Sequence, residues 1–126
     1  MVVAFIEAYP NNPLRATAEL MLGDVVDLLG DANEALVHYY LVEKFTEDLG
    51  LLAQAEFKTS RILVDLRQED QAIKRLTAFI DRYSEHPETI PVTAALAKIH
   101  TDLNAPRVAL TVLKGALDRF FTLSEV

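Results

Sequence analysis

One phrase occurs twice in this sequence, and it constrains the fold more than any other feature. FIEAYPNNP covers residues 5–13, and FIDRYSEHP covers residues 79–87. The two phrases lie 74 residues apart, which is twice 37. A fixed period of this length predicts a repeat architecture, because a single unit cannot bury its apolar face without its neighbours.

The period of 37 residues holds through the rest of the chain without gaps. Aligned positions keep their size class in all three copies: Gly23, Ser60 and Ala97; Leu29, Leu66 and Leu103; Ala35, Ala72 and Ala109; Tyr39, Leu76 and Leu113. We therefore predict a single domain over residues 1–126. It would consist of a half repeat at 1–13 and full repeats at about 14–50, 51–87 and 88–124.

Each copy contains two stretches with helical periodicity. In the first copy, Leu22, Val25, Val26 and Leu29 recur at the spacing of one helical face. GDAN then supplies a glycine stop and polar residues of the capping type. The predicted helices span residues 14–29, 35–45, 51–66, 72–83, 92–103 and 108–121. A helix end near residue 9 brings the expected total to about seven, and no segment alternates like a strand.

The two stretches of each copy together resemble a tetratricopeptide repeat. The family pattern places Leu and a small residue in the first helix and A-x3-F in the second. Here the matching residues are Leu22-Gly23 and Ala35-x3-Tyr39. The two phrases ending in Pro are similar to repeats of bacterial envelope-assembly proteins. The resemblance implies an all-α solenoid of antiparallel helix pairs in a right-handed superhelix, and a solenoid of the HEAT kind is the alternative.

Small residues mark the place where the two helices of a pair should cross. Antiparallel helices approach closely only where their side chains are small, so we expect Gly23 to face the Ala35 side of the second helix. An Ala35→Leu substitution should overpack that crossing and cost about 1–3 kcal/mol.

The resemblance also implies a binding groove, because the first helices of tetratricopeptide pairs line a concave face that holds a peptide. The candidate partner-binding residues are Leu20, Asp24, Asp27, Phe57, Arg61, Val64, Asp65, Lys98, Thr101 and Asp102. Leu20 and Phe57 would form an apolar pair there. The alternative is that Asp24 pairs with Arg61, and Lys98 with Asp102, contributing about 0–1 kcal/mol each.

Neither end of the chain has the polar cap that a solenoid needs. The candidate residues for self-association are Phe5, Leu113, Leu117, Phe120 and Phe121. Large exposed apolar patches mark interaction sites. We therefore hypothesise either that the chain is part of a longer array or that its ends bury against another copy, as a homo-oligomer.

The charge distribution argues against polyanionic partners. The net charge is −7, and residues 1–50 hold nine acidic and two basic residues. A nucleic-acid-binding protein needs a basic face that displaces counterions, and no basic block occurs. No apolar run approaches the length of a membrane span, so we expect no direct membrane insertion. Both a cytoplasmic and a periplasmic location remain open.

The residues needed for catalysis or for cofactors do not gather in the sequence. The chain has no cysteine, its four glycines are isolated, and its three histidines fall in different copies. We expect no phosphate loop, no metal site and no cofactor. The sequence therefore predicts a non-enzymatic scaffold that binds a protein or peptide, and the alternative is a spacer array that self-associates through its terminal helices.

Overall fold

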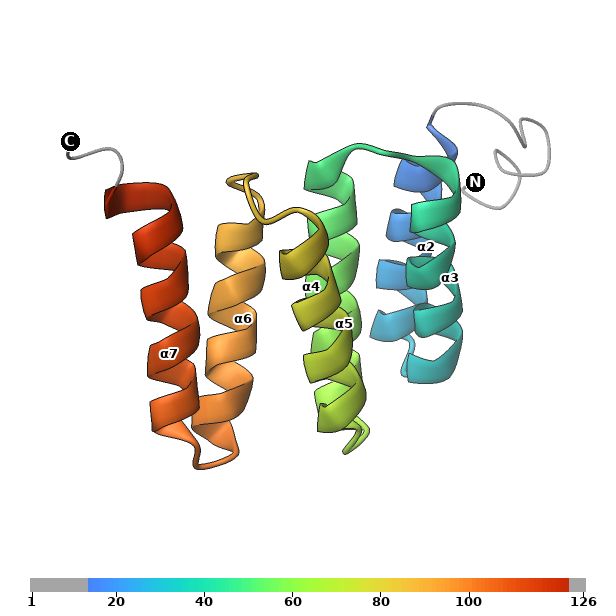
Figure 1. The fold of residues 1–126 in the computed structure, drawn as a ribbon. Helices are drawn as coiled ribbons and strands as arrows, with labels where there is room; N and C mark the ends of the chain where they lie inside the picture. The colour runs from blue at the N-terminus through green and yellow to red at the C-terminus, as the bar shows by residue number, and fades with distance from the viewer. Residues whose placement is uncertain (1–13, 123–126) are drawn as a thin grey trace. The chain divides into compact units, whose positions relative to one another are not determined.

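The structure, a computed structural model, describes residues 14–122. Within this range the chain forms α-helices and one terminal π-helix, and it forms no strand (Figure 1). The elements are α2 (Arg15–Leu28), α3 (Ala32–Phe45), α4 (Leu49–Asp65), α5 (Glu69–Arg82), α6 (Thr89–Asp102), α7 (Pro106–Leu117) and the π-helix η1 (Asp118–Thr122). The all-α prediction is confirmed. The half repeat at 1–13, with its expected seventh helix and Phe5, lies outside the described residues.

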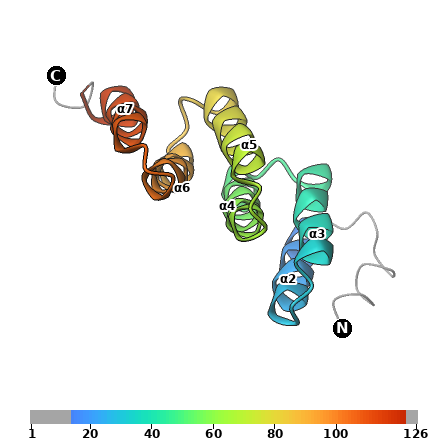
Figure 2. The ribbon, with the colours of Figure 1, turned by 90° about the horizontal axis from the view of Figure 1, so that it is seen from below.

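The chain divides into two compact units, residues 1–62 and 63–126. In the first unit, α2 and α3 lie side by side, as Figures 1 and 2 both show. In the second unit, α5 packs against α6, α6 packs against α7, and η1 contacts α7. Consecutive helices therefore pack on one another inside each unit.

The turn inside each helix pair repeats its backbone geometry every 37 residues. Positive φ angles occur at Gly30 (89°), Arg67 (64°) and Asn104 (63°). The N–H of the following residue donates to the carbonyl five positions earlier: Asp31 to Val26 at 3.2 Å, Gln68 to Leu63 at 2.8 Å and Ala105 to His100 at 2.8 Å. This bond and the left-handed residue together make a Schellman ending. The repeat seen in the sequence is thus also a repeat of backbone conformation.

The second helix of each pair begins earlier than the apolar pattern predicts. It begins at Ala32, Glu69 and Pro106, again 37 residues apart. The side chain of Asp31 caps α3 by accepting a hydrogen bond from the backbone N–H of Glu34 at 3.0 Å. Acidic residues stabilise a helix N-terminus, so these polar residues belong to the first helical turn and not to the loop.

Gly23 lies against the ring of Tyr39, on the Ala35 side of α3. A Cβ atom added at Gly23 would lie 2.5 Å from Cε1 of Tyr39. Ala35 is fully buried one helical turn before Tyr39 on the same face of α3. The absence of a side chain at Gly23 therefore makes room for the ring of Tyr39.

Candidate interaction surface

Two ion pairs join α2 to α4 within the first unit. Nζ of Lys58 lies 2.7 Å from Oδ1 and 2.6 Å from Oδ2 of Asp24. Nη2 of Arg61 lies 2.7 Å from Oδ2 of Asp27. Both partners of the second pair lie three residues after those of the first, so the pairs occupy successive turns of the two helices. They link the 49–62 part of α4 to α2.

The hydroxyl of Tyr39 connects α3 to the first of these ion pairs. It donates a hydrogen bond of 2.6 Å to Oδ1 of Asp24, the oxygen that also accepts from Lys58. Burial raises the pKa of Tyr39 above its ordinary value, and the hydrogen bond and negative charge of Asp24, with the charge of Asp27, raise it further. The positive charge of Arg61 acts in the opposite direction. The phenol therefore stays protonated and acts as a hydrogen-bond donor at neutral pH.

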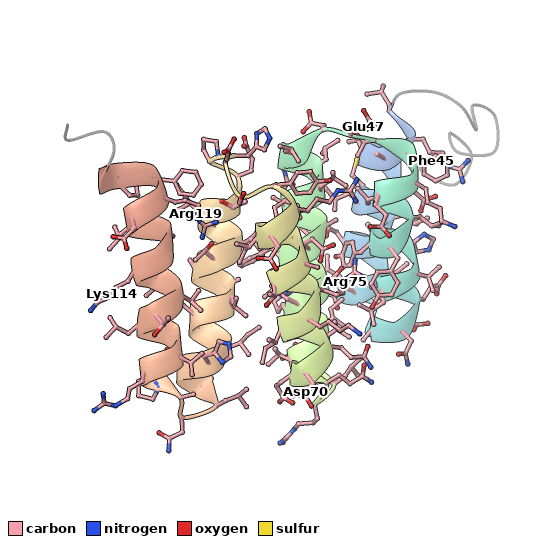
Figure 3. All side chains as sticks on the ribbon, viewed as in Figure 1. Phe45, Glu47, Asp70, Arg75, Lys114 and Arg119 are labelled. Carbon is pink, nitrogen blue, oxygen red and sulfur yellow. The ribbon has the colours of Figure 1, made fainter. Side chains whose placement is uncertain are left out.

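A second polar cluster lies between α2 and α3. The carboxylate of Glu19 is buried, and it accepts a hydrogen bond of 2.8 Å from Nδ1 of His38. Nη2 of Arg15 lies 3.5 Å from Glu19, and Nε2 of His38 lies 3.8 Å from Glu34. The guanidinium of Arg15 also lies over the ring of Phe45, 4.2 Å from its centre. Phe45 is the last residue of α3 and is labelled in Figure 3. A buried carboxylate requires such partners, so this cluster is structural.

The predicted binding residues of the first unit differ in their accessibility. Leu20 is buried, so it does not form an exposed apolar pair with Phe57. Phe57 is 50% exposed on α4. Asp24 and Asp27 are partly exposed and engaged by Lys58 and Arg61. The exposed residues of this side of α4 are Gln54, Phe57 and Arg61, and we call them the α4 face.

The ion-pair register differs from the one that the sequence suggested. We considered a pair between Asp24 and Arg61, which are one period apart, but Asp24 pairs with Lys58. The Lys58 and Arg61 pairs each span 34 residues, one helical turn less than the period. Asp31, which continues the spacing of Asp24 and Asp27, caps α3.

The remaining groove candidates lie in the second unit. Val64 is partly buried, and the others are exposed: Asp65, Lys98, Thr101 and Asp102. Nζ of Lys98 lies 2.8 Å from Oδ2 of Asp102, the internal pair that we considered from the sequence. Thr101 donates to the carbonyl of Ala97 at 2.9 Å. Lys98 and Asp102 therefore satisfy each other, and Thr101 is bonded to the backbone of α6.

The predicted self-association residues at the end of the chain are mainly exposed. Leu113, Leu117 and Phe121 are exposed, and Phe120 is half-buried. Arg119 reaches toward the α5–α6 connection, where Nη1 donates to the carbonyl of Ser84 at 3.4 Å (Figure 3). Lys114 projects from α7 on the side away from α6 (Figure 3).

Sequence reasoning missed Lys58 and the pair of Glu19 with His38. A signal was present for Glu19, because it occupies the position where the tetratricopeptide pattern has an aromatic residue. The aligned Thr93 is also buried, and its hydroxyl donates to the carbonyl of Thr89 at 2.7 Å. A polar residue at a core position of a repeat indicates a buried hydrogen bond.

The described residues contain no group of three or more histidine, cysteine, aspartate or glutamate side chains that could hold a metal ion. In the same part of the chain, none of the helices combines the length and the apolar character needed to cross a bilayer. No protein-family model matches this chain, and no curated protein has a matching sequence.

Proposed function

We propose that this protein is a non-enzymatic interaction scaffold of the tetratricopeptide kind, with helix pairs stacked in a right-handed solenoid. The repeated turn geometry at Gly30, Arg67 and Asn104 supports this proposal. In helical repeat proteins each pair has the same internal geometry and stacks on the next. Because a fold alone does not fix a function, the binding proposal rests on a particular surface.

That surface is the α4 face, and the exposure of Phe57 is the observation that carries the proposal. A half-exposed phenylalanine offers a large apolar area to a partner. Phe57 belongs to a regular α-helix, so little backbone ordering is needed on binding. Interfaces typically combine a central apolar anchor with a polar rim, as Phe57 and its charged neighbours do.

The charged side chains beside Phe57 indicate which side chains the partner presents to this surface. The side chain of Arg61 is about half exposed, and an exposed ion pair such as Arg61–Asp27 contributes only about 0–1 kcal/mol. A carboxylate from a partner can therefore share the guanidinium of Arg61 at little cost. We propose that the ligand is a peptide or helix in which an apolar side chain lies beside an acidic one.

Peptide selection tests this proposal and requires no candidate partner. Short random peptides displayed on phage are selected on the immobilised protein, and the enriched peptides are synthesised for calorimetric titration. We expect enrichment of apolar–acidic pairs. We also expect at least about tenfold weaker binding to Phe57→Ala, because loss of an interface anchor costs about 2 kcal/mol or more.

A Val37→Ala variant is the matched control. Val37 is an exposed aliphatic residue on α3 in the same unit, and it is not part of the α4 face. It should bind the selected peptides as the wild type does. Arg61→Glu should bind the peptides that carry an acidic residue more weakly than the wild type does. Peptides that bind Phe57→Ala and the wild type equally would show that the α4 face is not the binding site.

A further inference from the structure

The two ion pairs between α2 and α4 differ in which charge is exposed to solvent. In the Lys58–Asp24 pair the cation is the less exposed partner, with side-chain exposures of 27% for Lys58 and 40% for Asp24. In the Arg61–Asp27 pair the cation is the more exposed partner, at 51% for Arg61 against 25% for Asp27. An acidic group that approaches this part of the first unit therefore meets its positive charge at Arg61.

Arg61 lies beside Phe57 on the α4 face. The two residues are four positions apart, so their side chains are neighbours on one side of the helix. A ligand that places its apolar side chain on Phe57 therefore brings an adjacent acidic side chain to Arg61. A carboxylate is already bound there, because Oδ2 of Asp27 lies 2.7 Å from Nη2 of Arg61. Asp27 thus takes, from within the chain, the position that the ligand's carboxylate needs.

The carboxylate of Asp24 is bound to a different cation. Its Oδ1 accepts hydrogen bonds from Nζ of Lys58 at 2.7 Å and from the hydroxyl of Tyr39 at 2.6 Å. Its Oδ2 also accepts from Nζ of Lys58, at 2.6 Å. Side chains of α3 and α4 therefore hold Asp24 at Lys58, and Asp27 is the carboxylate that a ligand meets at Arg61.

The 37-residue repeat shows that a first helix forms without a carboxylate at the position of Asp27. The aligned residues are Val64 and Thr101, which lie in α4 and α6. An exposed ion pair also contributes little to stability. The charge of Asp27 can therefore be removed without loss of the fold, and its effect on the α4 face can be measured.

We propose that Asp27 is an internal competitor of the ligand, an autoinhibitory contact that lowers the affinity of the α4 face for acidic segments. Two carboxylates at one guanidinium repel each other, so the ligand must displace Asp27 or bind against its charge. A segment with an acidic group but no apolar side chain for Phe57 competes poorly with a carboxylate of the chain itself. Asp27 therefore selects segments that combine both features. This inference rests on the proposed function, since it concerns acidic segments bound at the α4 face.

Calorimetric titration of the selected peptides against Asp27→Asn tests the proposal. Asparagine keeps the shape of aspartate and removes its charge. Peptides with an acidic residue should bind Asp27→Asn about two- to fivefold more tightly than the wild type, because an exposed ion pair withholds its cation from a ligand to about that extent. Versions of the same peptides with the amide in place of the acid should bind both proteins equally.

Asp31→Asn is the matched control. It makes the same change of charge four residues further along the chain, and asparagine caps a helix as well as aspartate does. This variant should bind the acidic peptides as the wild type does. Circular dichroism checks the helicity of each variant. Asp27→Thr, which places the residue of the third copy at this position, replaces Asp27→Asn if that variant loses helicity.

The outcomes separate this inference from the proposed function. Acidic peptides that require Phe57 but bind Asp27→Asn no more tightly than the wild type would overturn the competitor and leave the proposed function intact. An equal gain for the amide peptides, or for Asp31→Asn, would overturn it as well, because Asp27 would then act through helix position or net charge. Acidic peptides that bind Phe57→Ala and the wild type equally would overturn both proposals.

Discussion

At the scale of the residue, the contact between Gly23 and Tyr39 is the most sensitive to side-chain size. A Cβ atom at position 23 would lie 2.5 Å from the ring, so Gly23→Ala forces the ring to move. Overpacking costs about 1–3 kcal/mol, and the better helix propensity of alanine returns up to about 1 kcal/mol. We expect urea unfolding to show a net loss of up to about 2 kcal/mol.

The aligned residues of the third copy supply the control for this prediction. That copy has Ala97 and Leu113 where the first has Gly23 and Tyr39. The double variant Gly23→Ala with Tyr39→Leu should therefore be more stable than the sum of its single variants predicts. A Gly23→Ala protein as stable as the wild type would mean that the ring shifts without cost.

The phenol of Tyr39 predicts a loss of stability in alkaline solution. Its folded-state pKa is raised, chiefly by burial, above the unfolded value of about 10. Above pH ~10 the unfolded chain releases the proton that the folded chain keeps, so stability is complete below that pH and falls above it by at most about 1.4 kcal/mol per pH unit. Urea unfolding of the wild type and Tyr39→Phe from pH 8 to 11 measures the difference. Parallel curves for the two proteins would contradict the prediction.

At the scale of the element, the turn inside each helix pair has a different residue at the equivalent left-handed position: Gly30, Arg67 or Asn104. The φ angle is 89° at Gly30 but 64° at Arg67, where a side chain makes the left-handed region unfavourable by about 1–2 kcal/mol. Arg67→Gly should therefore raise the free energy of unfolding by up to about 1 kcal/mol. Asn104→Gly should gain less, because asparagine tolerates this region. A thermal melt measures both, and a lower melting temperature for Arg67→Gly would contradict the expectation.

The helices were largely predictable from the sequence, because apolar periodicity reports the buried face of each one. Helix α6 begins at Thr89 and not at Val92. Errors of the same size fall at the starts of two second helices, which begin at Ala32 and Glu69 and not at Ala35 and Ala72. Their first turns are polar and exposed, so they leave no apolar signal. Capping by Asp31 and the acidic residues of the first turn, such as Glu69, stabilise them instead.

The polar contacts between helices were less predictable than the helices. The sequence places Asp24, Lys58 and Arg61 on their helices, but the choice of partner depends on how far one helix is displaced along the other. Because α4 is displaced along α2 by one turn from the expected register, Lys58 pairs with Asp24 and Arg61 pairs with Asp27. The same limit applies to Leu20, whose burial depends on packing that the periodicity of α2 does not determine.

At the scale of the whole molecule, uncovered apolar surface at the C-terminal end predicts uneven local stability. Local opening is easier where fewer apolar contacts must be broken. Leu76 of α5 is fully buried and the aligned Leu113 of α7 is exposed, so amides of α7 should exchange with solvent deuterium faster than those of α5 in dilute protein. Equal protection of α5 and α7 in dilute wild-type protein would show that the exposed side chains of α7 do not weaken the helix.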